Sequence, residues 1–394
     1  MRVGALLVLF FAAAGSTPDT DVAVASDFAV AAYLPEWRYE GANWDTIAEH
    51  VTHLILFSLE IAPDGSLAAL DRIPRPELLK QARAAATRHG TQLLICFGGN
   101  GRSAGFSPMV RDAHARTRFV RELVKLCDAH DFDGVDYNWE YPGYAFGRGY
   151  LPDPELRADY EGLGKLLKET RAAFKEGEGE GEGGGGGAAA GRVRSITMAY
   201  YPDGRQEQLL FERDAHHHVD LLHMMSYDQG GEQHSSYTFG KLAVKRGLAH
   251  LPAASLTLGL PFYGRHSKTG DWVTYEDIVQ GKQHGTALVG KAARKLDSVF
   301  VSGGSLGFNG PHTIGRKTKF AAKKGLGGVM IWEVGQDCRI REVKHGAQTH
   351  VANCPEGPKS SLLVAITRAM AKAGVQRARA LGWNAGGTIG KDEL

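Results

Sequence analysis

Apolar strand-like stretches alternate with helical patterns along most of this chain, and that alternation limits its fold more than any other feature. The strand candidates are Phe28–Leu34, His53–Leu59, Gln92–Phe97, Phe132–Glu140, Arg194–Tyr200, Val219–Ser226, Leu256–Phe262 and Gly328–Glu333. The helix candidates are Pro76–Arg88, Ala115–His130, Glu155–Phe174, Phe239–His250, Thr313–Lys324 and Ser360–Lys372. The pattern predicts a parallel α/β sheet, and eight strands are the number that closes a (β/α)8 TIM barrel.

An open, doubly wound sheet is the alternative fold. Such sheets usually begin with a glycine-rich turn between the first strand and its helix, and the residues after Leu34 contain no such turn. We therefore expect a single barrel domain over residues 26–378. The segment from Arg265 to Phe308 is too short for a large α+β insertion domain, so the cleft should be open. Trp272 and Tyr275 in that segment are candidates either for a ligand subsite or for packing a loop.

Residues 176–191 consist of glutamate, glycine and alanine and have almost nothing to bury. This stretch predicts a flexible insertion after the fourth strand's helix, on the face of the barrel opposite the usual active site. We expect it to be functionally silent. A domain boundary is the other interpretation, but four strands on either side would leave two half-barrels that need each other.

The charge balance and the cysteine count exclude several classes of protein. The chain has 394 residues, and 46 Lys and Arg against 44 Asp and Glu give a net charge of +2, so nucleic acid is not an expected partner. Four cysteines are too few for a disulfide-built scaffold. Cys338 and Cys354 flank a polar loop and are candidates for a disulfide, whereas Cys96 and Cys127 are expected as buried thiols. Nothing in the sequence calls for a cofactor or a metal.

Both ends carry targeting patterns. Residues 1–15 combine a positive start, a short apolar run and small residues, which predicts a secretory signal; a buried strand or a membrane anchor is the alternative, but the run is too short to span a bilayer. No other stretch predicts a membrane span. The tail, residues 379–394, ends in Lys391-Asp392-Glu393-Leu394, an endoplasmic-reticulum retention signal read by a receptor. We expect a monomeric protein of the endoplasmic-reticulum lumen, secreted if the signal is not used.

The segment from Phe132 to Pro142 carries the chemistry. Strand alternation places Asp136, Asn138 and Glu140 on one face, with apolar and aromatic side chains on the other. Polar side chains inside a barrel are costly to desolvate unless they are hydrogen-bonded into a site. A solvated edge strand is the alternative reading. Glu140 comes last, at the mouth where barrel enzymes react, and is the natural general acid.

This segment resembles the DGxDxDxE signature of glycoside hydrolase family 18, the chitinases and chitinase-like proteins. Other motifs follow in the family's order from residue 28 to residue 340. They are Tyr33-Leu34-Pro35-Glu36-Trp37, Phe97-Gly98-Gly99, Met225-Ser226-Tyr227-Asp228, Gly259-Leu260-Pro261-Phe262-Tyr263-Gly264 and Gly327-Gly328-Val329-Met330-Ile331-Trp332-Glu333.

The resemblance implies a retaining mechanism in which the substrate's own 2-acetamido group is the nucleophile. Glu140 would protonate the glycosidic oxygen, Asn138 would orient the acetamido group, and Asp136 would hold Asn138. Tyr227 would donate to the acetamido carbonyl. Asp133 belongs to the signature but lies on the opposite parity, so its expected role is structural.

The same resemblance supplies the sugar contacts. Trp332 would form the apolar floor, although Trp332 and Tyr33 are also candidates for core aromatics. The further positions carried by the motifs are Asp228, Met225, Trp37, Gly98 and Gly99.

Asn138 stands where the family usually has Asp. An amide cannot share a proton, and it removes a charge beside Glu140, so we expect a slower enzyme with a more acidic optimum. Three functions remain open. The first is hydrolysis of β-1,4 links in chitin oligomers or similar glycans. The second is a non-catalytic lectin, and the third is an endo-β-N-acetylglucosaminidase acting on N-glycan cores.

Overall fold

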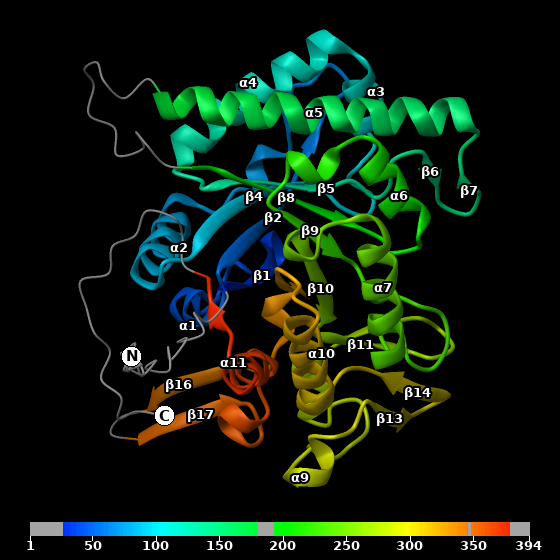
Figure 1. The fold of residues 1–394 in the computed structure, drawn as a ribbon. Coiled ribbons are helices and arrows are strands. Elements are labelled where there is room, and N and C mark those ends of the chain that lie inside the picture. The colour runs from blue at the N-terminus through cyan, green and yellow to red at the C-terminus, as the bar shows by residue number, and fades with distance from the viewer. Residues whose placement is uncertain (1–26, 180–192, 346–347, 379–394) are drawn as a thin grey trace, which may run out of the picture.

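Eight parallel strands close into a barrel in the computed structural model, which describes residues 27–179, 193–345 and 348–378 (Figure 1). The barrel strands are β1 (Asp27–Pro35), β2 (His53–Ile61), β4 (Gln92–Gly98), β5 (Gly134–Asn138), β8 (Ser195–Tyr200), β9 (Leu221–Met224), β10 (Leu256–Pro261) and β15 (Gly328–Trp332). Closure comes from β1, which pairs with both β2 and β15. The predicted TIM barrel is confirmed, and every expected strand is present.

Each barrel strand is followed by a helix that covers its outer face. These helices are α1 (Trp44–His50), α2 (Pro76–His89), α4 (Ala113–His130), α5 (Asp153–Gly179), α6 (Arg205–Glu212), α7 (Tyr237–His250), α10 (Pro311–Lys323) and α11 (Leu362–Ala373). Six of them match the predicted helices within a few residues. Helices α1 and α6 were not predicted, because two turns are too short for a helical period to stand out. Helix α3 (Phe106–Arg111), which precedes α4, was not predicted either.

Strand alternation divides the apolar side chains into two clusters. Val135, Tyr137 and Trp139 lie in the larger cluster, between barrel and helices. The Tyr137 hydroxyl is 2.7 Å from Thr170 Oγ1 on α5, and the Trp139 ring stacks on Phe106 of α3 at 5.1 Å. The other parity therefore points into the barrel, as predicted. The strand itself ends at Asn138, so Glu140 lies two residues beyond it.

The segment after β10 forms a small α+β unit beside the barrel mouth. Its antiparallel sheet contains β11 (Tyr263–His266), β12 (Trp272–Thr274), β13 (Ser298–Val301) and β14 (Gly304–Gly307), with the short helices α8 (Tyr275–Val279) and α9 (Gly290–Ala293). No large insertion domain occurs in the described chain, but this compact sheet was not anticipated. Tyr275 is buried and donates to the Ser360 carbonyl at 2.9 Å, so it packs the unit against the barrel rather than lining the cleft.

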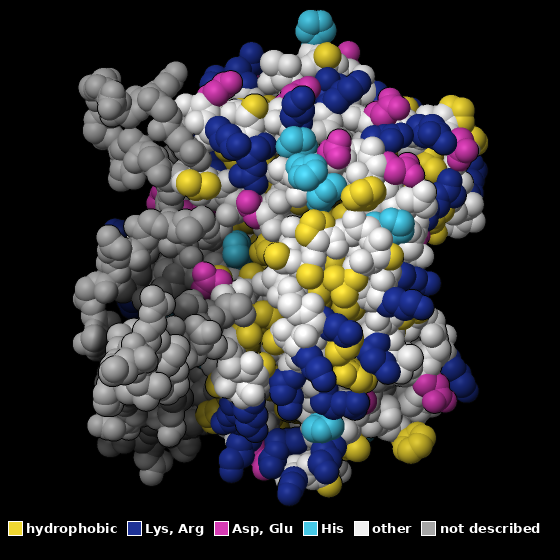
Figure 2. Space-filling model, in the orientation of Figure 1, with side chains coloured by type: hydrophobic (Ala, Val, Ile, Leu, Met, Phe, Trp, Pro, Cys, Tyr) yellow, Lys and Arg dark blue, Asp and Glu magenta, His cyan; other side chains and the backbone are white. Residues whose placement is uncertain are grey.

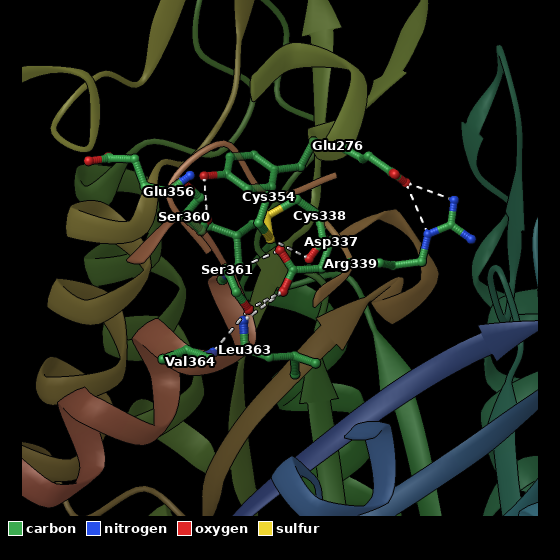
Figure 3. Close-up of a disulfide and its surroundings, with 12 residues drawn as sticks. Glu276, Asp337, Cys338, Arg339, Cys354, Glu356, Ser360, Ser361, Leu363 and Val364 are labelled. Carbon is green, nitrogen blue, oxygen red and sulfur yellow. Dashed lines mark hydrogen bonds and ion pairs between the residues drawn. A yellow bond between two sulfur atoms is a disulfide. The ribbon is translucent and has the colours of Figure 1, made fainter. Parts of the chain in front are cut away.

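A second hairpin, β16 (Ile340–His345) and β17 (Gln348–Asn353), is closed at its base by a disulfide between Cys338 and Cys354 (Figure 3). Asp337, next to this disulfide, accepts hydrogen bonds from the Leu362 and Leu363 amides at 3.0 Å. The hairpin base therefore holds the first turn of α11, and Figure 3 shows Asp337 lying against Ser361 and Leu363. Cys96 and Cys127 are buried free thiols, as expected.

The remaining strands are short: β3 (Leu67–Ala68), the β6 (Tyr144–Ala145) and β7 (Gly149–Tyr150) hairpin, and β18 (Gln376–Arg377). Helix α5 runs four residues into the stretch 176–191 that was expected as a loop; the rest of that stretch lies outside the described residues. The signal 1–15 and the tail 379–394 also lie outside them. Within the described chain, no helix combines the length and apolarity needed to cross a membrane.

Candidate active site

A cavity of about 250 Å³ opens at the C-terminal mouth of the barrel. It collects residues from β1, β2, β5, β8 and β15 and from loops at this end of the barrel, including the loop after β9. The predicted site residues that line it are Tyr33, Trp37, Asn138, Glu140, Met225, Tyr227, Asp228 and Trp332. Asp136, Asp133, Gly98 and Gly99 are not among its lining residues.

Asp136 lies beneath the cavity, fully buried inside the barrel. Tyr33 Oη donates to its Oδ2 at 2.9 Å, and Thr197 Oγ1 donates to its Oδ1 at 2.7 Å. The Cys96 thiol also hydrogen-bonds to this carboxyl group. Burial raises the pKa of Asp136 to about 6, although these hydrogen bonds oppose the shift. The buried His223 ring nitrogen Nε2 is 3.9 Å from Asp136 Oδ1.

Asn138 lies between Asp136 and Glu140. Its side chain hydrogen-bonds to the Glu140 carboxylate, which requires the amide nitrogen to donate. Its Oδ1 atom is buried and accepts no hydrogen bond from the described part of the chain. An unsatisfied buried acceptor is costly, so this oxygen is suited to a donor brought by a ligand.

Gly98 and Gly99 shape the wall beside Asn138. The Gly99 amide donates to the Asn138 carbonyl at 2.6 Å, and both glycines have positive φ, +99° and +105°. A Cβ on Gly98 would lie 2.4 Å from the Asn138 carbonyl oxygen, and one on Gly99 would lie 2.3 Å from the Phe57 ring. Gly98 therefore lets β4 approach β5 closely, and Gly99 leaves room for the Phe57 ring.

Glu140 is half-buried at the cavity edge. Burial raises the pKa of its carboxyl group to about 7, and the negative charge of Asp228 acts in the same direction. Hydrogen bonds from the Asn138 side chain, Tyr141 and the Asn100 amide oppose the shift without reversing it. A carboxyl group with a pKa near neutrality is suited to general acid–base chemistry.

Tyr227 and Asp228 lie on the loop after β9, at the opposite side of the mouth. Tyr227 Oη is 3.7 Å from the Met330 sulfur, a weak acceptor that leaves the hydroxyl free to bond a ligand. Asp228 Oδ1 accepts from Tyr263 Oη at 2.7 Å and lies 3.2 Å from Arg265 Nη1. Burial alone would raise the pKa of Asp228, but the bonds and charges of His234, Tyr263 and Arg265 lower it. Asp228 is therefore a fixed negative charge across from Glu140.

Aromatic rings form the floor and the two rims. Trp332 lies at the bottom, 5.4 Å from the Tyr33 ring and 4.8 Å from the Phe57 ring, and its buried Nε1 has no partner in the described chain. Trp37 and Trp272 stand at the rims with 55% and 51% of their surface exposed. Trp272 stacks on Tyr263 at 4.9 Å. Exposed rings of this kind are suited to stacking on the apolar face of a sugar.

Asp133 lies apart from the cavity, at the other end of the strand. Its Oδ2 accepts from Leu93 N at 2.6 Å and pairs with Arg83 Nη1 at 2.9 Å. These bonds hold the starts of β4 and β5 together, which fits the structural role expected from its parity.

Several residues that line the cavity were not predicted from the sequence: Phe57, Asn100, Arg102, Tyr141, Ala199 and Tyr201. Arg102 pairs with Glu36 at 2.6 Å, and its guanidinium lies 5.3 Å from the centre of the Phe57 ring. Nothing in the sequence linked Arg102 to Glu36, because they lie on different loops. Tyr141 directly follows Glu140, so its position was the one available signal. No group of three or more potential metal ligands occurs in the described residues.

Together these observations define a barrel protein with a cleft at its mouth, in which a titratable carboxyl group and an amide lie between aromatic rims. The chain belongs to the glycosyl hydrolases family 18, whose profile matches residues 29–337.

Curated relatives and solved structures agree with this family. The chain is 24% identical over 350 residues to an endochitinase of Manduca sexta, covering 74% of this chain and 60% of that protein. It is 26% identical over 298 residues to a probable chitinase 2 of Drosophila melanogaster, covering 62% and 57%. It thus spans about 60% of the length of these relatives. The Ostrinia furnacalis Group IV chitinase, solved with allosamidin, superposes with a TM-score of 0.66 at 21% identity, covering 89% of this chain and 100% of that one. At this identity the superposition shows the shared fold.

Proposed function

We propose that this protein hydrolyses β-1,4 bonds next to N-acetylglucosamine, in chitin oligomers or similar glycans, by substrate-assisted retaining catalysis. The observation that carries the proposal is the pair Glu140 and Asn138 at one cavity. A carboxyl group with a pKa of about 7 lies beside an amide whose oxygen has no partner in the described chain. The names of the relatives, chitinases in several organisms, support the same substrate class.

Glu140 protonates the leaving glycosidic oxygen. At pH values below its pKa most of the carboxyl groups carry the required proton. The carboxylate left behind then removes a proton from the water that opens the intermediate. One residue thus serves as acid and then as base, and no second carboxylate is required at nucleophile distance.

The acetamido group of the substrate supplies the nucleophilic oxygen. Asn138 Oδ1 is free to accept the acetamido N–H, and Tyr227 Oη is free to donate to its carbonyl oxygen. Trp332 supports the sugar from below. Asp136 is held beneath the cavity by Tyr33 and Thr197, whereas the Asn138 side chain bonds to Glu140.

Asn138 limits the rate, because an amide can neither take the acetamido N–H proton nor place a negative charge beside the acetamido nitrogen, which becomes positively charged as the oxazolinium ion forms. The acidic pH optimum predicted from the sequence rests only on the negative charge that is absent because residue 138 is Asn and not Asp. Burial of Glu140, which is the largest influence on its pKa, acts in the opposite direction. We therefore place the working range up to about pH 7.

Two alternatives use the same cleft. A lectin that binds N-acetylglucosamine oligomers without cutting them is favoured by Asn138. An endo-β-N-acetylglucosaminidase acting on N-glycan cores is favoured by the terminal Lys391-Asp392-Glu393-Leu394, which supports residence in the endoplasmic reticulum and capture by a retention receptor. Fluorescence microscopy of a chain tagged internally, with and without these four residues, tests that location.

The test of function is release of a fluorophore from di- and tri-N-acetylchitooligosaccharide glycosides by the native protein, Glu140→Gln and Asn138→Asp. Slow turnover in the native protein, loss in Glu140→Gln and a gain in Asn138→Asp are the expected results. Turnover only in Asn138→Asp would favour the lectin. Inactivity of all three on these substrates, with release of glycans from a glycoprotein, would favour the endoglycosidase.

A further inference from the structure

A basic groove runs along the outside of the barrel, between α10 and α11 and beside α9, with a volume of about 400 Å³. It shares no lining residue with the cavity at the barrel mouth. Eight Lys and Arg side chains line it, and none of the described residues lining it is acidic. They include Lys291, Lys295, Arg316, Lys319, Arg368 and Lys372. Figure 2 shows the dark blue side chains gathered over this part of the surface.

This concentration is local, because the whole chain has a net charge of only +2. Neither α10 nor α11 contains a single Asp or Glu. In the described chain Arg294 pairs with Glu356, whereas Lys319, Arg368 and Lys372 have no carboxylate within 4 Å. Like charges held together on two packed helices repel one another, so the groove is stabilised by whatever anion neutralises it.

The walls and the floor indicate the shape of that anion. Gly315 of α10 faces Ala365 and Ala369 of α11, so the two helices approach closely and small residues lie between the two rows of basic side chains. The positive side chains stand on both sides of the groove. Along α11 they run from Lys359, just before the helix, to Lys372 in its last turn, and α11 is about 18 Å long at 1.5 Å per residue. Charges spread over this length match an extended polyanion rather than a single small ion.

The kinds of side chain that are missing from the described lining also limit which class of anion the groove could bind. No Phe, Tyr or Trp side chain is among the described residues that line the groove, so His312 is the only aromatic ring of this lining on which a base of a single-stranded nucleic acid could stack. No large apolar pocket is present to hold the anchor residues of an acidic helix or peptide. What remains is a hydrated chain whose charges are its main contacts.

We propose that the groove between α10 and α11 binds an anionic polysaccharide, one carrying sulfate or carboxylate groups along its length. The binding is electrostatic and independent of the cleft, so the protein is able to hold this glycan while the cleft remains open. This inference does not rest on the proposed hydrolysis.

The test uses the full chain and a fluorescent dextran sulfate oligosaccharide, with neutral dextran of equal length as the comparison. The double variant Lys319→Glu/Arg368→Glu reverses one charge on each wall; both side chains are exposed, and Glu is as good a helix former as Lys or Arg. Arg316 is left alone because its guanidinium lies over the Tyr237 ring at 4.1 Å. The matched control, Arg121→Glu/Lys125→Glu on α4, changes the net charge equally on another face.

We expect the native protein to bind dextran sulfate but not dextran, and more weakly as ionic strength rises. The groove variant should weaken binding about tenfold or more, and the α4 control should leave it within about twofold. Turnover of chitooligosaccharide glycosides should be the same in all three proteins, so failure of the groove and failure of the cleft are distinguishable.

Three results would overturn the proposal. They are no binding of dextran sulfate at low salt, equal weakening in the groove variant and the α4 control, and tighter binding of an oligonucleotide of the same charge. If the charge-reversed variant unfolds, Lys319→Gln/Arg368→Gln tests the same walls with a smaller change, and unchanged binding in that variant also counts against the groove.

Discussion

Glu140 is the residue whose titration should be visible in the kinetics. Burial raises its pKa to about 7, and the general acid works only while it carries its proton. We predict that kcat/KM stays level below about pH 7 and falls about tenfold for each pH unit above it. Initial rates on the trisaccharide glycoside over a pH series measure this limb.

Asp228 provides the control for that profile. Its negative charge contributes to the raised pKa of Glu140, so Asp228→Asn should move the alkaline limb to lower pH as well as weaken sugar binding. A limb near the ordinary pKa of a glutamate in the native protein would mean that burial does not govern this group.

Asp136 makes a second prediction, on stability. A pKa of about 6 in place of an ordinary value near 3.8 means that the folded state holds the proton more tightly than the unfolded chain. The tighter binding of this proton contributes about 3 kcal/mol to the free energy of unfolding at low pH. This contribution is lost as the pH rises from about 4 to 6. Asp136→Asn removes the buried charge, so it should raise the melting temperature at pH 7.5 and not at pH 4.5.

Thermal unfolding of both proteins at the two pH values measures the difference. Asp45→Asn is the comparison, since Asp45 lies on the surface of α1. A higher melting temperature of Asp136→Asn at both pH values would show that a change in packing, and not the loss of the buried charge, stabilises the variant.

At the scale of the elements, α10 holds the loop after β9 in place through hydrogen bonds from Lys317. Buried Lys317 of α10 donates from Nζ to the Ser235 carbonyl at 2.8 Å, to Ser235 Oγ at 2.7 Å and to Asn309 Oδ1 at 2.7 Å. Ser235 Oγ in turn donates to the Ser226 carbonyl at 2.7 Å. Lys317 therefore fixes both ends of the loop that carries Tyr227 and Asp228 into the cleft.

Lys317→Met should loosen this loop while keeping the length of the side chain. We predict that KM rises more than kcat falls, with a loss of about tenfold in kcat/KM, because the contacts that position the sugar are displaced. Lys319→Met, two residues along on the exposed side of α10, should change neither parameter. If both variants changed kcat and KM to the same extent, the cause would be a disturbance of helix α10 and not of the loop.

At the scale of the whole molecule, a deletion in the stretch after α5 tests whether that stretch contributes to the stability or the activity of the barrel. The composition of this stretch predicts a flexible connection, and shortening such a connection changes its closure entropy by less than about 1 kcal/mol. Deleting Gly183–Gly187 should therefore leave both kcat/KM and the melting temperature nearly unchanged. A deletion of equal length at residues 229–233, in the loop fixed by Lys317, should abolish activity. A large loss from the glycine deletion would show that the stretch contributes to the fold or the cleft.

The sequence predicted the barrel because strand parity and strand–helix order are local patterns. It placed Asp136, Asn138 and Glu140 on the inner face for the same reason. It could not show that burial governs the pKa of Glu140, or that Lys317 reaches the loop after β9, because both depend on packing between distant segments. Helix α1 and the antiparallel sheet beside the cleft were missed because their strands and turns are too short for a period to appear.

Strand β18 has a practical consequence for protein engineering. It lies parallel to the start of β1, pairing Gln376 with Asp27, and the Ala378 amide donates to the Phe28 carbonyl at 3.1 Å. The first and last described residues of the domain are thus neighbours. A linker of about three residues would join them, and new termini opened between Gly179 and Val193 would give a circular permutant. Its cleft strands would keep their order around the barrel.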